Sequence, residues 1–332
     1  MQYNRQGDDH VRERLLFLAG SIPTGVAAVA IEPAADGDVA AFAIAMAAVR
    51  LLLAGSRALE GGWPAALRTG VTRAYVLSAL LFVVSIPIDH PVRYVLWGVG
   101  VLIESRALLR ENRAAAKILR RQGDLSVVAR DDAGSALDPH HFAERFGLLL
   151  IILIGEVVIA AGETTAELHI GTAGGWAALV AAMALAATLW WLYFDAAVDI
   201  NRRVLELAGG SPTVARALFA IGHMAPAFAL LLIAAGVGLL LDGEDPGAGY
   251  WFCSCGLGIY LIGTRVFFAV ATRLQHVVRL AVVIATFELA WLEDVVSPHA
   301  FLWILAGWAL ACAAVSTWRR PAPDDAELKR YV

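Results

Sequence analysis

The residues of this sequence that could do chemistry are ionisable side chains placed inside long apolar stretches. The clearest case is the segment 140–163, HHFAERFGLLLIILIGEVVIAAGE, which is long enough to cross a membrane and carries Glu144, Arg145 and Glu156. Arg145 and Glu156 are eleven residues apart, and at about 100° per residue an α-helix returns to within roughly 20° over that distance. These two side chains therefore share one helix face. An ionisable residue inside a membrane span predicts a functional site, because its dehydration is costly.

Further ionisable residues lie inside other apolar stretches. At about 1.5 Å per residue, four of them lie roughly 15–21 Å from a helix end, near the middle of a hydrocarbon layer about 30 Å thick: Arg50, Glu156, His223 and Glu288. Glu104, Arg145, Asp195 and Arg265 lie nearer the end predicted to be cytoplasmic. We predict a polar core for transport made of Arg50, Glu156, His223, Arg265 and Glu288, with supporting ion pairs from Glu104, Glu144, Arg145 and Asp195.

The same residues also have a purely structural interpretation. Each charge can be compensated by an opposite charge inside the bundle and hold two helices in register. A mid-membrane glutamate can instead titrate as its surroundings change, because desolvation favours its protonated form and a nearby arginine favours its charged form. Both interpretations are open for His223, since histidine titrates near neutrality but is often a hydrogen-bonded packing residue inside a membrane.

The composition sets the class of protein. Of 332 residues, 59% are hydrophobic and 17% are charged, and the mean hydropathy is +0.66. Soluble domains contain about a quarter charged residues, so the sequence predicts an integral membrane protein with an all-α, polytopic helical bundle. Apolar runs of about 20 residues predict ten transmembrane helices, at 14–34, 39–57, 70–88, 91–109, 141–162, 174–195, 214–241, 249–272, 276–295 and 299–318.

The loops between these segments alternate in charge. One set holds nearly all the arginines and lysines, and the other set is acidic with the single Arg93. The positive-inside rule therefore predicts a protein of the cytoplasmic membrane with both termini in the cytoplasm.

An internal repeat is predicted from a series of individually weak matches. RLLFLAGSIP from Arg14 resembles RALFAIGHMAP from Arg216, and VRLLLAGSR around Arg50 resembles TRVFFAVATR around Arg265. Arg73 and Trp97 have counterparts in Arg279 and Trp303. Their common order predicts two six-helix units in parallel orientation, the first lacking its two initial helices, which would lie upstream of Met1. The predicted divisions are a four-helix incomplete repeat 1–109, a basic cytoplasmic linker 110–139, a six-helix repeat 140–320 and a cytoplasmic tail 321–332.

Three segments carry a family resemblance. They are Glu144-Arg-Phe-Gly-Leu through Gly155-Glu156, Trp190-Trp-Leu-Tyr-Phe-Asp195, and the helix of Gly222-His223. Together they resemble the bacterial low temperature requirement A (LtrA) family of polytopic membrane proteins, over essentially the whole chain. That family has a further N-terminal segment with a Glu-Leu-Phe-Phe-Asp-Leu-type motif, which this sequence lacks. The resemblance implies a membrane location and no established reaction.

Three function classes are open. The first is a secondary transporter or ion pathway, whose partners are the lipid bilayer and an unidentified small solute or ion. The second is a membrane-embedded enzyme acting on a lipid-linked substrate, for which His140, His141 and Glu144 are the one weak metal-ligand group. Asp138 and Pro139 before that group are typical of a helix start, so we expect no metal. The third is a non-catalytic sensor or scaffold linked to growth in the cold.

Two further expectations concern cofactors and aromatic residues. No glycine-rich phosphate motif occurs, so no nucleotide cofactor is expected. No nucleic-acid partner is expected either. Trp190, Trp191, Tyr193 and Phe194 are typical of an aromatic belt at a membrane interface.

Overall fold

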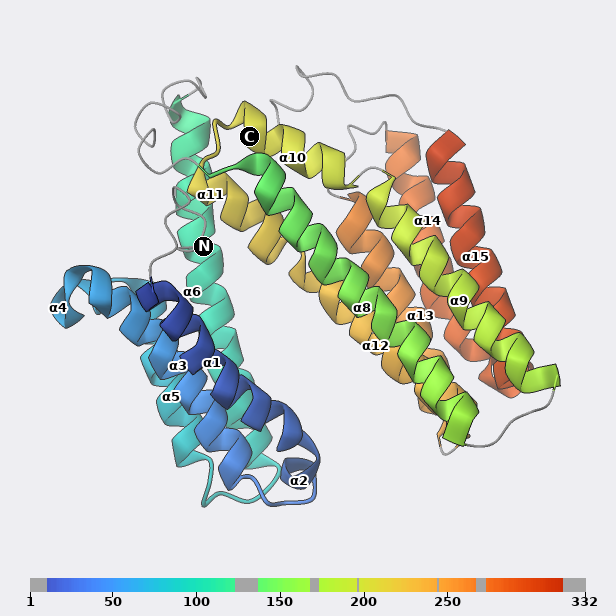
Figure 1. Ribbon diagram of the computed structural model, residues 1–332, viewed down its shortest axis with the longest axis horizontal. Coiled ribbons are helices and arrows are strands. Elements are labelled where there is room, and N and C mark those ends of the chain that lie inside the picture. Colours follow the sequence, from blue (N-terminus) through green and yellow to red (C-terminus); the bar gives the residue numbers. More distant parts are fainter. Residues whose placement is uncertain are drawn as a thin grey trace. The chain divides into compact units, whose positions relative to one another are not determined.

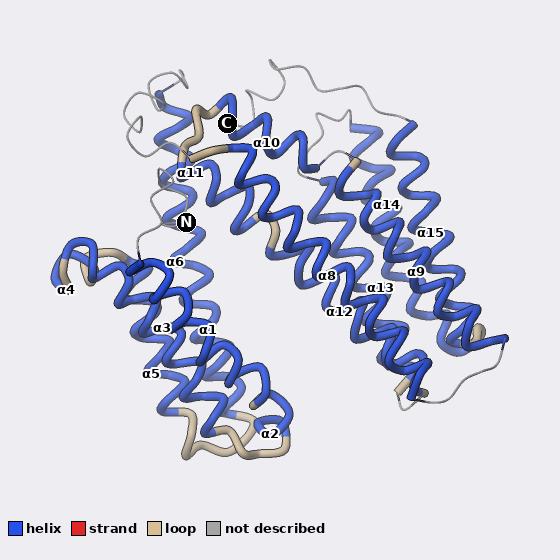
Figure 2. Tube along the Cα trace, viewed as in Figure 1, coloured by secondary structure: helices blue, strands red, loops and turns tan. Residues whose placement is uncertain are grey.

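The structure is a computed structural model, and it describes residues 11–122, 137–167, 173–195, 197–243, 245–266 and 273–318. Within these ranges every regular element is a helix, so the predicted all-α class is confirmed (Figures 1 and 2). The chain separates into two compact units, Met1–Gly123 and Asp124–Val332. Each unit is described by itself.

The first unit is built from four long helices and two short ones. Its elements are α1 (Val11–Val29), α2 (Ile31–Ala35), α3 (Ala40–Gly61), α4 (Trp63–Ala66), α5 (Gly70–Val84) and α6 (Val92–Gln122). Helix α3 packs between α1 and α5, and α5 packs in turn on α6. Phe82 stacks on Trp97 with ring centroids 5.7 Å apart, beside the buried Ala47 and Ala79. Small residues thus let the helices approach while the aromatic rings fill the space between them.

Helix α6 continues beyond residue 109 to Gln122. The added stretch reads RENRAAAKILRRQ, whose arginines, alanines, leucine and lysine are strong helix formers. The first part of the predicted linker 110–139 is therefore helical, and the boundary between the two units falls inside that linker. Residues 123–136 lie outside the described chain.

The second unit contains six long helices and several short elements. Its elements are α8 (Pro139–Glu167), α9 (Ala173–Phe194), α10 (Ala197–Leu207), α11 (Pro212–Ala215), η2 (Arg216–Ile221), α12 (Met224–Asp242), α13 (Pro246–Leu261), η3 (Ile262–Val266), α14 (Arg273–Glu288), η4 (Leu289–Asp294) and α15 (Pro298–Trp318). Helix α12 packs on α13 and α8, while α9 packs on α8 and α15. Leu189, Leu230, Leu257 and Tyr260 are fully buried in this core.

Glycines bring α12 and α13 together. A Cβ atom on Gly236 would lie 2.7 Å from Sγ of Cys253, and one on Gly256 would lie 2.9 Å from the carbonyl oxygen of Ala229. Only glycine fits at such distances. This is the close backbone approach by which helices associate where no hydrophobic effect drives them together.

The length and apolar composition of several helices agree with a membrane protein. Five helical segments of the described chain are long and apolar enough to span a bilayer, namely Ala40–Leu59, Pro139–Thr164, Gly174–Leu207, Arg216–Asp242 and Pro298–Val315. Leu18–Val29 and Gly70–Val84 are shorter apolar helices. The ten spans of the sequence analysis stay a prediction, as do the internal repeat and its divisions.

Candidate functional site

The most strongly buried pair of opposite charges in the described chain joins Arg50 of α3 to Glu104 of α6. Nε of Arg50 lies 2.5 Å from Oε1 of Glu104, and Nη2 donates to Oε2 at 3.5 Å. The two side chains are only 8% and 15% exposed. Arg50 was predicted for the polar core from its depth, and it lies about 15 Å from the start of α3 at 1.5 Å per residue. Glu104 was predicted as a supporting ion-pair residue nearer the cytoplasmic end. The structure adds that they contact each other.

The other hydrogen bonds of Arg50 come from its own helix and from α5. Nη1 donates to the carbonyl of Met46 at 2.9 Å, and Nε also lies 2.9 Å from Oγ of Ser78. The guanidinium carbon sits 4.3 Å from the centre of the Phe82 ring, a distance at which the ring face attracts a cation. Three helices therefore converge on one guanidinium, and Glu104 supplies the only carboxylate that pairs with it in the described chain.

A glycine on α6 makes room for this arrangement. A Cβ on Gly100 would lie 2.8 Å from Oγ of Ser78, so any larger residue would displace the hydroxyl from Arg50. Ser78 and Gly100 were not predicted from the sequence. The signal for Ser78 was its polarity within the apolar run AYVLSALLFVV, whereas nothing in the sequence marks Gly100.

The second buried polar group is formed by His223 and Tyr193. Nδ1 of His223 lies 3.1 Å from the carbonyl oxygen of Leu218, and Nε2 lies 2.6 Å from the hydroxyl of Tyr193. A carbonyl only accepts, so in the neutral ring Nδ1 carries the proton, Nε2 accepts, and the Tyr193 hydroxyl donates. Both ring nitrogens are thereby satisfied without any charge. His223 is 4% exposed.

Local backbone geometry explains why the Leu218 carbonyl is available. Residues Arg216–Ile221 form a π-helical turn, η2, and α12 begins only at Met224. Because the regular i to i−4 hydrogen bonds of an α-helix are interrupted here, the Leu218 carbonyl can accept a hydrogen bond from the imidazole of His223. The rings of Phe146 and Phe219 lie 5.0 Å and 5.6 Å from the imidazole. The geometry is that of a hydrogen-bonded packing residue, one of the two interpretations of His223 that the sequence left open.

Tyr193 corrects one expectation. An interfacial aromatic belt was predicted from Trp190 through Phe194, and Trp190 and Trp191 are indeed 43% and 48% exposed. Tyr193 is 2% exposed, so its assignment to the belt was wrong. Its hydroxyl is turned inward because His223 offers it the hydrogen bond that a buried phenol requires.

Two other predicted carboxylates lie on helix surfaces. Glu156 is exposed on α8, on the same face as Ile152 and Ile159, which are 63% and 50% exposed. Glu288 is exposed at the end of α14. No hydrogen bond or ion pair joins Glu156, His223 and Glu288 to one another in the described chain. The structure thus leaves Glu156 and Glu288 on apolar surfaces.

The remaining predicted residues lie near helix ends. Asp195 follows α9 and accepts a hydrogen bond from Oγ1 of Thr317 at 3.0 Å. Glu144 and Arg145 are exposed in the second turn of α8. Arg265 lies in the π-helical turn η3, and its side chain is outside the described residues.

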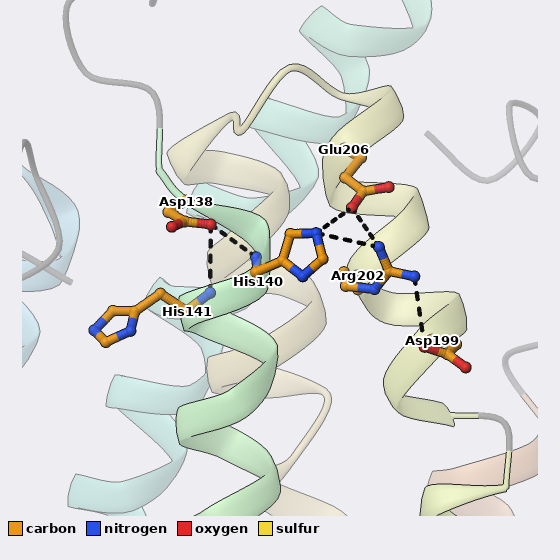
Figure 3. Close-up of polar contacts among 6 residues, drawn as sticks. All are labelled: Asp138, His140, His141, Asp199, Arg202 and Glu206. Atoms are coloured by element: carbon orange, nitrogen blue, oxygen red, sulfur yellow. Dashed lines mark hydrogen bonds and ion pairs between the residues drawn. The ribbon is translucent and has the colours of Figure 1, made fainter.

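A surface cluster surrounds the start of α8 (Figure 3). Asp138 accepts from the backbone N–H groups of His140 and His141 at 2.9 Å and 3.4 Å, which is the predicted helix cap. On the other side, Glu206 of α10 pairs with Arg202 at 2.6 Å and with His140 at 3.4 Å. The side chains of His140 and His141 point in different directions in Figure 3, and the described chain holds no group of three metal-ligating residues.

Comparison with known proteins gives the family. The model of the bacterial low temperature requirement A protein (LtrA) matches residues 1–316. This chain belongs to the LtrA family. An uncharacterized protein of Rhizobium meliloti (strain 1021), RA0937, is 26% identical over 277 residues, which are 80% of this chain and 64% of that protein. The chain thus spans less than two thirds of the length of that curated relative, and no solved structure matches.

Two of the segments that carry the LtrA resemblance are involved in the His223 group. The ERFG segment supplies Phe146, and the WWLYFD segment supplies Tyr193. The third, the Gly222-His223 turn, supplies the imidazole itself. Segments far apart in this LtrA sequence therefore meet around one side chain.

Proposed function

We propose that this LtrA-family membrane protein conducts a proton or transports a small ion coupled to one, and that the Arg50–Glu104 pair is the exchangeable site. The observation that carries the proposal is an ion pair buried between α3 and α6, near the middle of α3. Dehydrating two charges is costly, and replacing such a pair by apolar residues often stabilises a protein. Ionisable residues kept inside membrane helices mark ion and proton pathways.

The pair has two protonation states with different consequences. When Glu104 is ionised, it neutralises Arg50 and holds α3 against α6. When a proton arrives and binds a carboxylate oxygen of Glu104, that counter-charge disappears and the guanidinium keeps the Met46 carbonyl and the Ser78 hydroxyl as partners. Release of the same proton on the other side restores the ion pair and completes one cycle. No proton is consumed.

Glu156 and Glu288 are the further proton-binding groups of this proposal. Each is an exposed carboxylate on a helix of the second unit. His223 has a packing role in the proposal, because both of its ring nitrogens are engaged. In this proposal the protein lies in the cytoplasmic membrane with both termini inside, an orientation that the distribution of arginines favours.

Proton flux into liposomes tests the proposal. The purified chain is reconstituted with the pH dye pyranine trapped inside, and valinomycin with potassium clamps the voltage while the external pH is stepped. Wild-type protein should acidify the lumen faster than protein-free liposomes. Glu104→Gln should lower the rate to that of protein-free liposomes, because glutamine keeps the size of the side chain but binds no proton.

Matched variants separate this role from a general loss of structure. Glu156→Gln should also slow the flux, whereas Glu163→Gln, the same change at an exposed position of α8, should leave it unchanged. Arg50→Lys keeps the charge and should retain part of the flux. Unchanged flux in Glu104→Gln would contradict the role of the pair, and wild-type flux no faster than the protein-free background would contradict proton coupling.

A further inference from the structure

Arg93 in the first turn of α6 is buried without a counter-charge. The residue is 5% exposed, and its Nε donates to the carbonyl of Ile88 at 2.8 Å. Its Nη1 atom is buried and has no hydrogen-bond partner in the described chain, where no carboxylate forms an ion pair with it either. A buried guanidinium with unused donors is strongly unfavourable, so this position calls for acceptors that the described protein does not supply.

The start of helix α6 also disfavours an uncompensated positive charge at Arg93. Helix α6 has 31 residues, and its first turn contains no acidic residue. The beginning of a helix carries a partial positive charge, which favours a bound anion and opposes a cation. The backbone N–H groups of Arg93 and Val95 already donate to the carbonyls of Asp89 and Pro91, so the dipole and the guanidinium are what an anion would meet. A guanidinium placed there is therefore repelled by its own helix. Both features are relieved by the same partner, an anion with several oxygen acceptors.

The surroundings of Arg93 are apolar and exposed. Val92, Tyr94 and Val95 next to it are 53%, 44% and 60% exposed. The ring of Tyr94 stacks on His90 with centroids 5.7 Å apart, and such rings are typical of the headgroup level of a membrane. Arg110 lies 17 residues further along α6, about 26 Å away at 1.5 Å per residue, so Arg93 and the basic segment lie at opposite ends of the predicted span 91–109.

We propose that Arg93 and the first turn of α6 bind a phosphate oxyanion, with the headgroup of an anionic phospholipid as its source. A guanidinium presents parallel N–H groups that match two phosphate oxygens, and the apolar neighbours suit the acyl chains of a lipid. The proposal is independent of proton flux. Free inorganic phosphate has the same chemistry, and the experiment below separates the two sources.

Lipid titration of the purified full-length protein in neutral detergent tests the site. The apparent Kd for palmitoyl-oleoyl phosphatidylglycerol is obtained from the rise in Tm, with phosphatidylcholine as the zwitterionic control. We expect phosphatidylglycerol to bind and Arg93→Gln to weaken it at least about tenfold, since a buried charge pair loses one partner. Arg106→Gln removes the same charge from an exposed site on α6 and should change Kd by no more than about twofold.

Asp89 provides the decisive second variant, because it is the nearest exposed carboxylate in the sequence. If an external anion occupies the site, Asp89→Asn removes a repulsion and tightens phosphatidylglycerol binding. If Asp89 is itself the missing counter-ion, this variant lowers Tm without lipid and leaves the binding unchanged, which would overturn the proposal. Wild-type affinity in Arg93→Gln would also overturn it.

Competition by inorganic phosphate against phosphatidylglycerol would support the oxyanion site and assign it to free phosphate, whereas absence of competition supports the lipid.

Discussion

Each of the two compact units buries a hydrogen-bonded pair of ionisable side chains, and the two pairs differ in charge. The first unit buries a pair of full charges, Arg50 and Glu104, and surrounds it with hydrogen bonds and an aromatic face. The second unit buries a neutral pair, His223 and Tyr193. Nδ1 of the imidazole donates to a backbone carbonyl and Nε2 accepts from the Tyr193 hydroxyl, so both ring nitrogens are hydrogen-bonded. A charged pair responds to protonation by losing its attraction. A neutral pair has no charge to lose, and its function is to hold helices together.

The largest effect should come from breaking the charged pair. Arg50→Met leaves Glu104 buried without its partner and should lower the free energy of unfolding by about 3–5 kcal/mol. Adding Glu104→Leu should recover most of that loss, because the double variant removes both dehydrated charges. Unfolding in mixed micelles by denaturing detergent measures the single and double variants in one cycle. Additive losses would show that the two residues do not interact.

The neutral pair should be less sensitive. Tyr193→Phe removes the hydroxyl that donates to Nε2 of His223 and leaves that nitrogen buried and unpaired, which should cost about 1–3 kcal/mol. The control is Tyr94→Phe, at a ring that is 44% exposed, where we expect no change beyond about 0.5 kcal/mol. The same unfolding measurement applies. Equal losses for the two tyrosines would contradict the hydrogen bond between Tyr193 and His223.

Two glycines of α6 should respond with opposite signs. Gly100→Ala places a Cβ 2.8 Å from Oγ of Ser78, rotates that hydroxyl away from Arg50, and should destabilise the first unit by about 1 kcal/mol. Gly98→Ala meets nothing within 4 Å and should stabilise α6 by up to about 1 kcal/mol, the difference in helix propensity. Thermal unfolding of the two variants side by side checks the signs. A stabilising Gly100→Ala would show that Ser78 is dispensable to the pair.

The smallest effect is expected at the surface pair of Figure 3. The side chains of Arg202 and Glu206 are 29% and 37% exposed, one helical turn apart. Glu206→Gln should therefore cost no more than about 0.5 kcal/mol, and salt should erase the difference. A loss comparable to that of Arg50→Met would mean that exposure does not separate the two kinds of ion pair.

The sequence was sufficient for the fold class, but it identified only some of the buried ionisable residues: Glu156 and Glu288 are exposed, and the buried Arg93 was not selected. Apolar runs of membrane length predicted helices, and depth along each run selected Arg50, Glu104 and His223. Which ionisable residues contact each other depends on how the helices pack. Arg50 and Glu104 are 54 residues apart and were assigned to different sets, because counting along one helix gives no information on its neighbours. Tyr193 was misplaced for a related reason: α9 is apolar on all sides, so no periodicity marks its buried face.

Helix α10 was missed for a different reason. It has 11 residues, too few for a membrane span, and it contains Asp199, Arg202, Arg203 and Glu206. Its pattern AVDINRRVLEL places Val204 and Leu205 on a buried face and the charges outside, which is the amphipathic signal that a search for apolar runs ignores. Figure 1 shows this helix at the end of the unit where α8 begins, beside the cluster of His140.

Proton flux in Glu104→Gln and Tyr193→Phe, reconstituted at equal amounts of folded protein, tests most directly whether the charged pair is the exchangeable one. We predict that Glu104→Gln falls to the rate of protein-free liposomes while Tyr193→Phe stays within about twofold of wild type, since losing one neutral hydrogen bond removes no proton-binding group from the pathway. The opposite order, or equal losses in both variants, would contradict the distinction between a charged exchange site and a neutral packing site.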